Sequence, residues 1–375
     1  METQRYEHLG PYGDLVGEVA GRGPLHPRLA PGPESQRLIR GLLGFDERPE
    51  APLDVRVERT WTEPGLRGEE LSWSVGYGPR TRAWLLLPLD AAGPVPGVVA
   101  LHDHGGFKFL GREKIADGPD GAAAEVAGPR EVHYGDRPFA NDLARRGLAV
   151  LVHDVFLWGS RRFPEEAMPD RIRAMGGTTL GLDEVDRYNL IARPHEDLVA
   201  KYCAALGISL SGIIAHEDRI AVSYLKSRPE VNGIVGCVGL SGGGCRAALL
   251  QASSDDVSAT VVVGMMSTQA ALLDRHVDSH TWMFFPPGLA RHGDWPDLAA
   301  CRAPSPLMVQ YDLDDGLFPQ GGMRDAHQVI AAHYEAAGDG AAYVGEFYPG
   351  PHKFDRAMQA AAFDWLGDRL ARAGG

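Results

Sequence analysis

The sequence predicts an α/β fold, in which helices cover both faces of a mostly parallel sheet. Short, nearly continuous apolar runs recur from residue 97 onward, as is typical of strands buried on both faces. Helical patterns fill the intervals between them, and this alternation favours parallel strands joined by right-handed crossovers. With 375 residues, 44% of them hydrophobic, the chain has ample material for one large core.

The individual elements follow from these patterns. Three β-type segments come first, at 53–60, 70–76 and 81–88, and turn residues separate them as in an antiparallel meander. The apolar runs expected to form parallel strands cover 98–102, 148–153, 233–240, 259–264, 306–311 and 343–348. The expected helices cover 137–146, 196–206, 216–228, 243–252, 322–336 and 354–371.

Domain organisation is predicted from the stretches outside these elements. Residues 1–50, rich in Gly and Pro with one helix near 35–43, are expected to be an N-terminal extension packed on the outside of a single domain, 51–372. Three intervals are too long for simple connections, and each follows the C-terminal end of a parallel strand, where open α/β sheets bind ligands. We expect them to form a lid; they are the first insert (107–135), the second insert (156–195) and the third insert (266–300).

Composition excludes several classes of function. The formal net charge is −13 with no basic run, so a nucleic-acid surface is not expected. Neither a signal peptide nor a membrane span is evident near the start, which points to the cytoplasm and to no membrane partner. The four cysteines are far apart and are expected to be reduced, partly buried thiols: Cys203, Cys237, Cys245 and Cys301.

The clearest chemical motif is Gly239-Leu240-Ser241-Gly242-Gly243, which fits G-x-S-x-G. Alone it is weak, because 47 of the residues are glycine. Its context is specific: it follows an apolar strand and opens a helix, as a nucleophile elbow does. Ser241 is therefore the candidate nucleophile, and the alternative is a glycine-rich turn with an idle serine.

A serine nucleophile needs a base and an acid, which in this layout follow it in that chain order: acid, then histidine. His352 comes directly after the last strand and before the final helix, where the histidine is expected. The acid should follow the penultimate strand, where Asp312, Asp314 and Asp315 stand. Asp315 is preferred because it directly precedes a turn that re-enters the core.

The oxyanion of an acyl-transfer intermediate needs preorganised N–H donors. The backbone N–H of Gly242 is one expected donor, and that of His104, in the loop after the first parallel strand, is the other. His102 and His104, with Asp103 between them, could alternatively belong to a metal site, but no third ligand is evident. No metal and no cofactor is expected.

Together these motifs resemble the dienelactone hydrolase and acetyl xylan esterase-like branch of the α/β hydrolases. The resemblance covers roughly 80–372 and rests on the serine elbow with its lead-in 218–231 and on three further motifs: LeuHisAspHisGlyGly (101–106), AspAspGlyLeuPhePro (314–319) and ProHisLysPhe (351–354). It implies the α/β-hydrolase fold and a carboxylesterase activity. Dienelactone hydrolases proper use cysteine, so Ser241 favours the esterases. The segment 154–162 further implies structural or substrate-positioning roles for Asp154 and Arg161.

The sequence thus predicts a serine carboxylesterase that hydrolyses a small ester through an acyl-enzyme intermediate. Sugar acetyl esters are among the candidate substrates. Two rivals remain: a lactonase, peptidase or C–C bond hydrolase with the same triad, and a binding protein on a hydrolase fold. A homo-oligomer is compatible with the sequence. The residues expected to bind substrate, besides Arg161, are aromatic side chains of the inserts, which could equally be lid core: Phe107, Phe156, Trp158, Trp282, Phe284 and Phe285.

Overall fold

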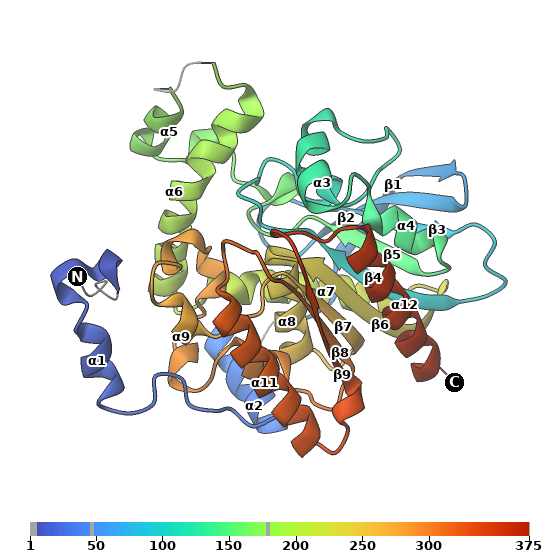
Figure 1. The fold of residues 1–375 in the computed structure, drawn as a ribbon. Coiled ribbons are helices and arrows are strands. Elements are labelled where there is room, and N and C mark those ends of the chain that lie inside the picture. Colours follow the sequence, from blue (N-terminus) through green and yellow to red (C-terminus); the bar gives the residue numbers. More distant parts are fainter. Residues whose placement is uncertain (1–5, 46–48, 178–180, 375) are drawn as a thin grey trace.

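The computed structural model describes residues 6–45, 49–177 and 181–374 and is built on a nine-stranded mixed sheet (Figure 1). The strand order is β1-β2-β3-β5-β4-β6-β7-β8-β9. The antiparallel part consists of β1 (Leu53–Glu63), β2 (Leu66–Ser74) and β3 (Thr81–Pro88), with β3 also antiparallel to β5 (Ala149–His153). The parallel part joins β5 to β4 (Val95–Leu101), β6 (Val231–Leu240), β7 (Val257–Val263), β8 (Leu307–Asp312) and β9 (Tyr343–Tyr348). The predicted fold class is confirmed.

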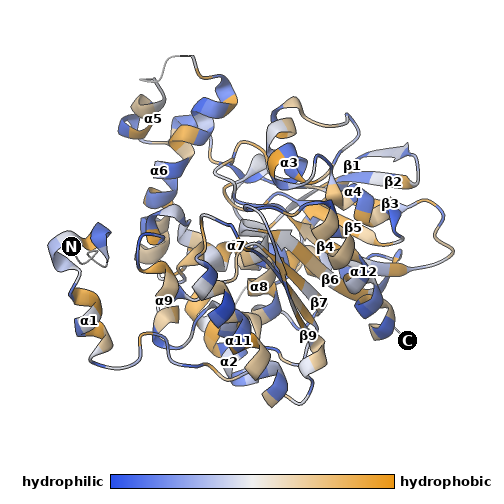
Figure 2. Ribbon diagram, viewed as in Figure 1, coloured by the Kyte–Doolittle hydropathy of each residue, from blue (hydrophilic) through white to orange (hydrophobic). Residues whose placement is uncertain are grey.

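Helices cover both faces of this sheet because the central strands are apolar on both sides. One face packs against α2 (Pro33–Leu43), α7 (Leu210–Lys226), α8 (Gly242–Ser253) and α11 (Gln320–Ala336). The other packs against α4 (Phe139–Arg145) and α12 (Arg356–Ala373). Figure 2 shows hydrophobic residues along the central strands, whereas α6 and α11 alternate between hydrophilic and hydrophobic stretches. Two apolar cores result, one on each side of the sheet.

The remaining helices are short, with one exception. The α-helices outside the two layers are α1 (Leu15–Ala20), α3 (Ala127–His133), α5 (Asp170–Gly177), α6 (Glu184–Ala205), α9 (Gln269–Leu272) and α10 (Trp295–Ala299). The 3₁₀ helices are η1 (Glu7–Tyr12), η2 (Arg112–Lys114), η3 (Ala124–Val126), η4 (Gly159–Arg161), η5 (Glu165–Ala167), η6 (Val277–Ser279), η7 (Trp282–Phe284), η8 (Leu289–Arg291) and η9 (Gly340–Ala342). The exception is α6, which spans 22 residues.

The N-terminal extension divides into two parts. No residue of η1 or α1 is buried, and Figure 1 shows this part standing away from the sheet. By contrast, α2 buries Ile39 and Leu43 in one of the two cores. The expectation that all of 1–50 lies outside the domain is therefore corrected for α2; residues 1–5 and 46–48 of that stretch lie outside the described residues.

In the described part of the chain, no single helix is both long and apolar enough to cross a membrane. One pair, α6 and α7, which are bent by 88° relative to each other, reaches that length and composition only when the two are taken together.

Candidate active site

Ser241 lies in the turn between β6 and α8 with φ 56° and ψ −117°, a conformation that non-glycine residues rarely adopt. Its N–H donates to the carbonyl oxygen of Val263 at 2.8 Å, and its own carbonyl oxygen accepts from Cys245 N at 2.8 Å. The turn is too tight for side chains on its flanks. A Cβ at Gly239 would lie 2.5 Å from backbone atoms of Gly243, and one at Gly243 would overlap the carbonyl oxygen of Leu101. These contacts explain why glycine flanks the serine on both sides.

His352 lies in the loop between β9 and α12, beside the Ser241 turn. A Cβ on Gly264, directly after β7, would be 3.3 Å from His352 Cε1 and 2.9 Å from Leu240 Cδ1. The ring is thus over the ends of β6 and β7, and both His352 and Ser241 line the same cavity.

The Asp315 carboxylate contacts the His352 ring at Nδ1. His352 Nδ1 donates to Asp315 Oδ2 at 2.6 Å, and Asp315 Oδ1 accepts from Leu317 N at 2.8 Å. Burial alone would lower the pKa of His352. The hydrogen bond to Asp315 and its charge outweigh that effect, so the pKa is raised above its ordinary value. The pair therefore has the geometry of an oriented general base.

The two other aspartates of this loop have different surroundings. Asp314 is exposed and accepts from Gly350 N at 2.8 Å, away from the ring. Asp312 is buried and accepts from Lys353 N at 3.0 Å, and burial raises the pKa of its carboxyl to about 7. In the described residues, one ligand atom each from Asp312, Asp315 and His352 lies within 4.8 Å of the others. Of the three aspartates, Asp315 is the one that hydrogen-bonds His352.

The loop after β4 abuts the Ser241 turn. A Cβ on Gly242 would lie 2.5 Å from His104 N, so the two backbone amides expected to bind an oxyanion are close neighbours. Neither N–H has an acceptor within the described residues. The side chains of the alternative metal site diverge. His102 Nδ1 contacts the Asp103 carbonyl oxygen at 3.0 Å, whereas His104 Nε2 contacts Glu196 at 3.0 Å.

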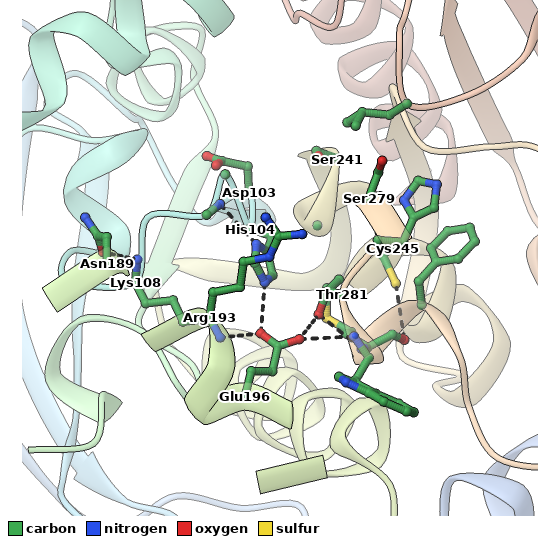
Figure 3. Close-up of a pocket in the computed structure, with 18 of the residues that line it drawn as sticks. Asp103, His104, Lys108, Asn189, Arg193, Glu196, Ser241, Cys245, Ser279 and Thr281 are labelled. Atoms are coloured by element: carbon green, nitrogen blue, oxygen red, sulfur yellow. Dashed lines mark hydrogen bonds and ion pairs between the residues drawn. The ribbon is translucent and has the colours of Figure 1, made fainter. Parts of the chain in front are cut away.

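The cavity above Ser241 has a volume of about 890 Å³, and all three inserts contribute to its wall. From the first insert and its lead-in come Gly105, Gly106, Lys108 and His133. From the second insert come Leu182, Asp186, Asn189, Leu190 and Arg193. From the third come Asp278, Ser279, His280, Thr281, Trp282, Met283 and Phe284. Figure 3 shows Arg193 reaching from α6 into this cavity, on the side of His104.

Of the aromatic residues predicted to bind substrate, the structure brings Trp282 and Phe284 to the cavity. Phe285 instead packs against the Phe284 and His280 rings, with centroids 5.7 and 6.5 Å apart. Trp158 is fully buried beneath the loop, its ring 5.0 Å from that of His104. Phe107 closes a turn, its N–H donating to the His104 carbonyl oxygen at 3.2 Å, and the neighbouring Lys108 lines the wall in its place.

Arg161 and Asp154 brace the loop after β5 and do not line the cavity. Arg161 is buried, pairs with Glu217 and donates to the carbonyl oxygen of Tyr77 at 3.0 Å. Asp154 accepts from the backbone N–H groups of Arg112 and Ser160, both at 2.9 Å. The expectation that Arg161 contacts substrate is thus corrected to a structural role.

The polar lining residues that the sequence reasoning missed include Lys108, Asn189, Arg193 and Glu196. Asn189, Arg193 and Glu196 lie on α6. The sequence predicts a helix only from residue 196, so the first half of α6 falls in the second insert. A signal was present. Asp183 caps the helix by accepting from Asp186 N, and buried Val185, Tyr188, Ile191 and Ala192 follow at helical spacing.

Comparisons with known proteins agree with this architecture. No family model matches the chain. The "Putative hydrolase YtaP" of Bacillus subtilis (strain 168) is 24% identical over 314 residues, which cover 82% of this chain and 89% of that protein.

The similar solved structures include three esterases. The "putative acetyl xylan esterase" of Bacteroides fragilis NCTC 9343 has a TM-score of 0.67 and 15% identity, covering 96% of this chain and 95% of its own. A glucuronoyl esterase from Solibacter usitatus has a TM-score of 0.61 and 14% identity, covering 89% and 92%. Acetyl xylan esterase 1 from Thermoanaerobacterium sp. JW/SL YS485 has a TM-score of 0.56 and 14% identity, covering 92% and 96%. The chain has the α/β-hydrolase fold.

Proposed function

We propose that the protein is a serine carboxylesterase that hydrolyses a small ester through an acyl-enzyme intermediate. The observation that carries the proposal is the contact of 2.6 Å between His352 Nδ1 and Asp315 Oδ2, made beside a serine held at φ 56°. A strained serine, a histidine and a buried carboxylate in this arrangement match the roles of nucleophile, base and orienting acid.

In the proposed reaction, Ser241 Oγ attacks the ester carbonyl carbon while His352 Nε2 accepts the serine proton. The tetrahedral intermediate collapses, the C–O bond to the alcohol breaks, and His352 returns the proton to the leaving alkoxide. Water then attacks the acyl-enzyme with His352 again as the base, releasing the acid and free Ser241. The Asp315 contact keeps the proton on Nδ1, so that Nε2 is free to accept.

The N–H groups of Gly242 and His104 are proposed to donate to the oxyanion. Two features support this: the two amides are adjacent, and neither is committed to an acceptor within the described chain. Such preorganised donors stabilise charge that develops only in the transition state.

The substrate class follows from the cavity. A volume of about 890 Å³ is in the range of small-molecule sites. The wall mixes polar groups such as Asn189, Arg193 and Ser279 with apolar ones such as Trp282 and Phe284, which suits a polar alcohol bearing a short acyl group. Two of the similar structures are called acetyl xylan esterase and one glucuronoyl esterase, so acetylated sugars are the first natural-type substrates to test.

The experiment is a screen of p-nitrophenyl esters and acetylated sugars with wild type and Ser241→Ala. We expect short-chain esters to be turned over, and the variant to lose several orders of magnitude in kcat while remaining folded. If the variant kept more than about a tenth of wild-type activity, a loss below ~1.4 kcal/mol of transition-state stabilisation, the assignment of Ser241 would be wrong. Turnover of lactones or amides in preference to esters would show that the same triad acts as a lactonase or peptidase instead.

A further inference from the structure

Glu196 on α6 is a buried carboxylate that collects donors from both of the other insert regions. Its side chain is 4% exposed. Glu196 Oε2 accepts from His104 Nε2 at 3.0 Å and from Lys108 Nζ, and Oε1 accepts from Trp282 N at 3.0 Å and from Thr281 Oγ1 (Figure 3). Four donors satisfy both oxygens, and they come from the loop after β4 and from the third insert. A carboxylate with so many donors acts as a fixed junction between these segments.

The hydrogen bonds also fix the tautomer of the His104 ring. Gly106 N donates to His104 Nδ1 at 3.1 Å, so Nδ1 is an acceptor and Nε2 must carry the proton that Glu196 accepts. Burial lowers the pKa of His104 despite the carboxylate, in keeping with a neutral ring. The turn below it needs the left-handed conformations of Gly105 and Gly106, at φ 56° and 64°. The ring is therefore held at both nitrogens across a tight turn.

This turn follows His104, whose backbone nitrogen lies close to the elbow. Because a Cβ on Gly242 would lie 2.5 Å from His104 N and 2.8 Å from His104 Cβ, the loop and the elbow are in close contact. A small movement of the His104 side chain would therefore move the amide relative to Ser241. Misplacement by about 1 Å can cost about 10²-fold in rate.

We propose that Glu196 is a positioning residue, which acts through the His104 ring to hold the His104 N–H in register with that of Gly242. This inference rests on the proposed esterase function. Lys108 contributes by neutralising the buried charge, and the contacts to Thr281 and Trp282 tie the third insert to the same junction.

The test compares Glu196→Gln with Glu217→Gln. Glu217 is an equally buried carboxylate that accepts from Phe156 N at 2.8 Å and pairs with Arg161, but it does not line the cavity, so it controls for losing a buried charge. In Glu196→Gln one carboxylate oxygen is replaced by an NH₂ group, which cannot accept hydrogen bonds from the donors that face it. We expect the kcat of Glu196→Gln on a p-nitrophenyl ester to fall at least about 10-fold, which approaches the loss caused by removing an oxyanion donor. Its KM should change less than about threefold. Glu217→Gln should lower the melting temperature but keep kcat. Equal kcat in the two variants would overturn the proposal.

A second variant keeps the proposal testable if Glu196→Gln does not fold. His104→Ala removes the ring but leaves the backbone N–H and the other three donors to Glu196. The kcat of His104→Ala should fall as far as that of Glu196→Gln. The double variant should be no slower than either single variant, because both changes break the same contact between Glu196 and the His104 ring. An unchanged kcat in His104→Ala, or additive losses in the double variant, would contradict the proposal. Ser241→Ala is measured alongside. If it keeps its activity, the esterase function itself fails; if it loses activity while the Glu196 and His104 variants do not, only the positioning role fails.

Discussion

At the scale of single residues, the site depends on which carboxylate contacts His352. The chain offers three aspartates within four positions, and only the fold distinguishes them. Asp315 accepts from the His352 ring, whereas Asp314 accepts from the backbone N–H of Gly350. Asp312 is buried, and the pKa of its carboxyl is raised to about 7. The sequence could favour Asp315 from the turn that follows it, but the neighbourhood of Asp312 depends on β8 and β9 lying side by side.

Replacing Asp315 with Asn should therefore be far more harmful than replacing Asp314. Asp315→Asn removes the charge and favours the wrong histidine tautomer, so we expect kcat to fall by roughly 10³- to 10⁴-fold. In Asp314→Asn the amide oxygen can still accept from Gly350 N, and kcat should stay within a few fold. The measurement is ester turnover by folded variants. A larger loss in Asp314→Asn than in Asp315→Asn would assign the acid differently.

The pH dependence should report the charges around His352. The base must be neutral, so kcat/KM should fall as pH drops through the pKa of His352, which lies above its ordinary value of about 6.5. The carboxylates that raise it are Asp315, Asp312 and Asp103. Since the pKa of the Asp312 carboxyl is about 7, this group is only partly ionised where His352 titrates. Asp312→Asn removes that partial charge, so the pKa of His352 falls and the acid limb of the profile moves modestly to lower pH. An acid limb that stays in place, or moves to higher pH, would show that Asp312 does not act on the ring.

At the scale of elements, the strands were predictable, whereas the helices inside the inserts were not. Each expected strand is present because strands buried on both faces leave a continuous apolar signal, as 233–240 does for β6. The first half of α6 was missed because Pro194 and several charged residues weaken a helix whose apolar face is stabilised by tertiary contacts, such as Tyr188 on Phe109. Glu196 lies in the predicted helix 196–206, but its contact with His104 could not be predicted, because no sequence pattern links residues 92 positions apart.

The elbow makes a prediction at this scale. Gly243→Ala places a Cβ on the carbonyl oxygen of Leu101, and backbone there cannot yield, so we expect a loss of about 1–3 kcal/mol in the free energy of unfolding, as for overpacked cores. Gly367 in α12 is the matched control, because a Cβ there meets nothing within 4 Å. Gly367→Ala should stabilise by up to about 1 kcal/mol through helix propensity. Urea unfolding measures both, and equal effects at the two sites would refute the steric account.

At the scale of the whole molecule, the three inserts, which leave the same edge of the sheet, all contribute to the wall of the cavity at Ser241. The shared edge could be predicted from the chain order, because parallel strands end on one side. The particular wall residues could not, as Trp158 and Arg161 show by packing beneath the loops rather than in the cavity.

The size of this cavity leads to a prediction about the substrate. A cavity of about 890 Å³ accepts a small ester or a short oligomer, whereas a polymer must fit past α6 and the third insert. We expect acetylated short oligosaccharides to be hydrolysed faster, per acetyl group, than the corresponding polysaccharide. Acetate release measured at equal acetyl concentration decides this, and faster release from the polymer would mean that the wall opens to a groove.

The most direct test of the central claim is covalent labelling of Ser241 by a fluorophosphonate, read by mass spectrometry of the intact protein and its peptides. Such a probe reacts with a serine only when a base activates it. We predict one adduct per chain in the wild type, located on Ser241, no adduct in Ser241→Ala, and much slower labelling in His352→Ala. A folded wild-type protein that gains no adduct, or an adduct that persists in Ser241→Ala, would contradict the account.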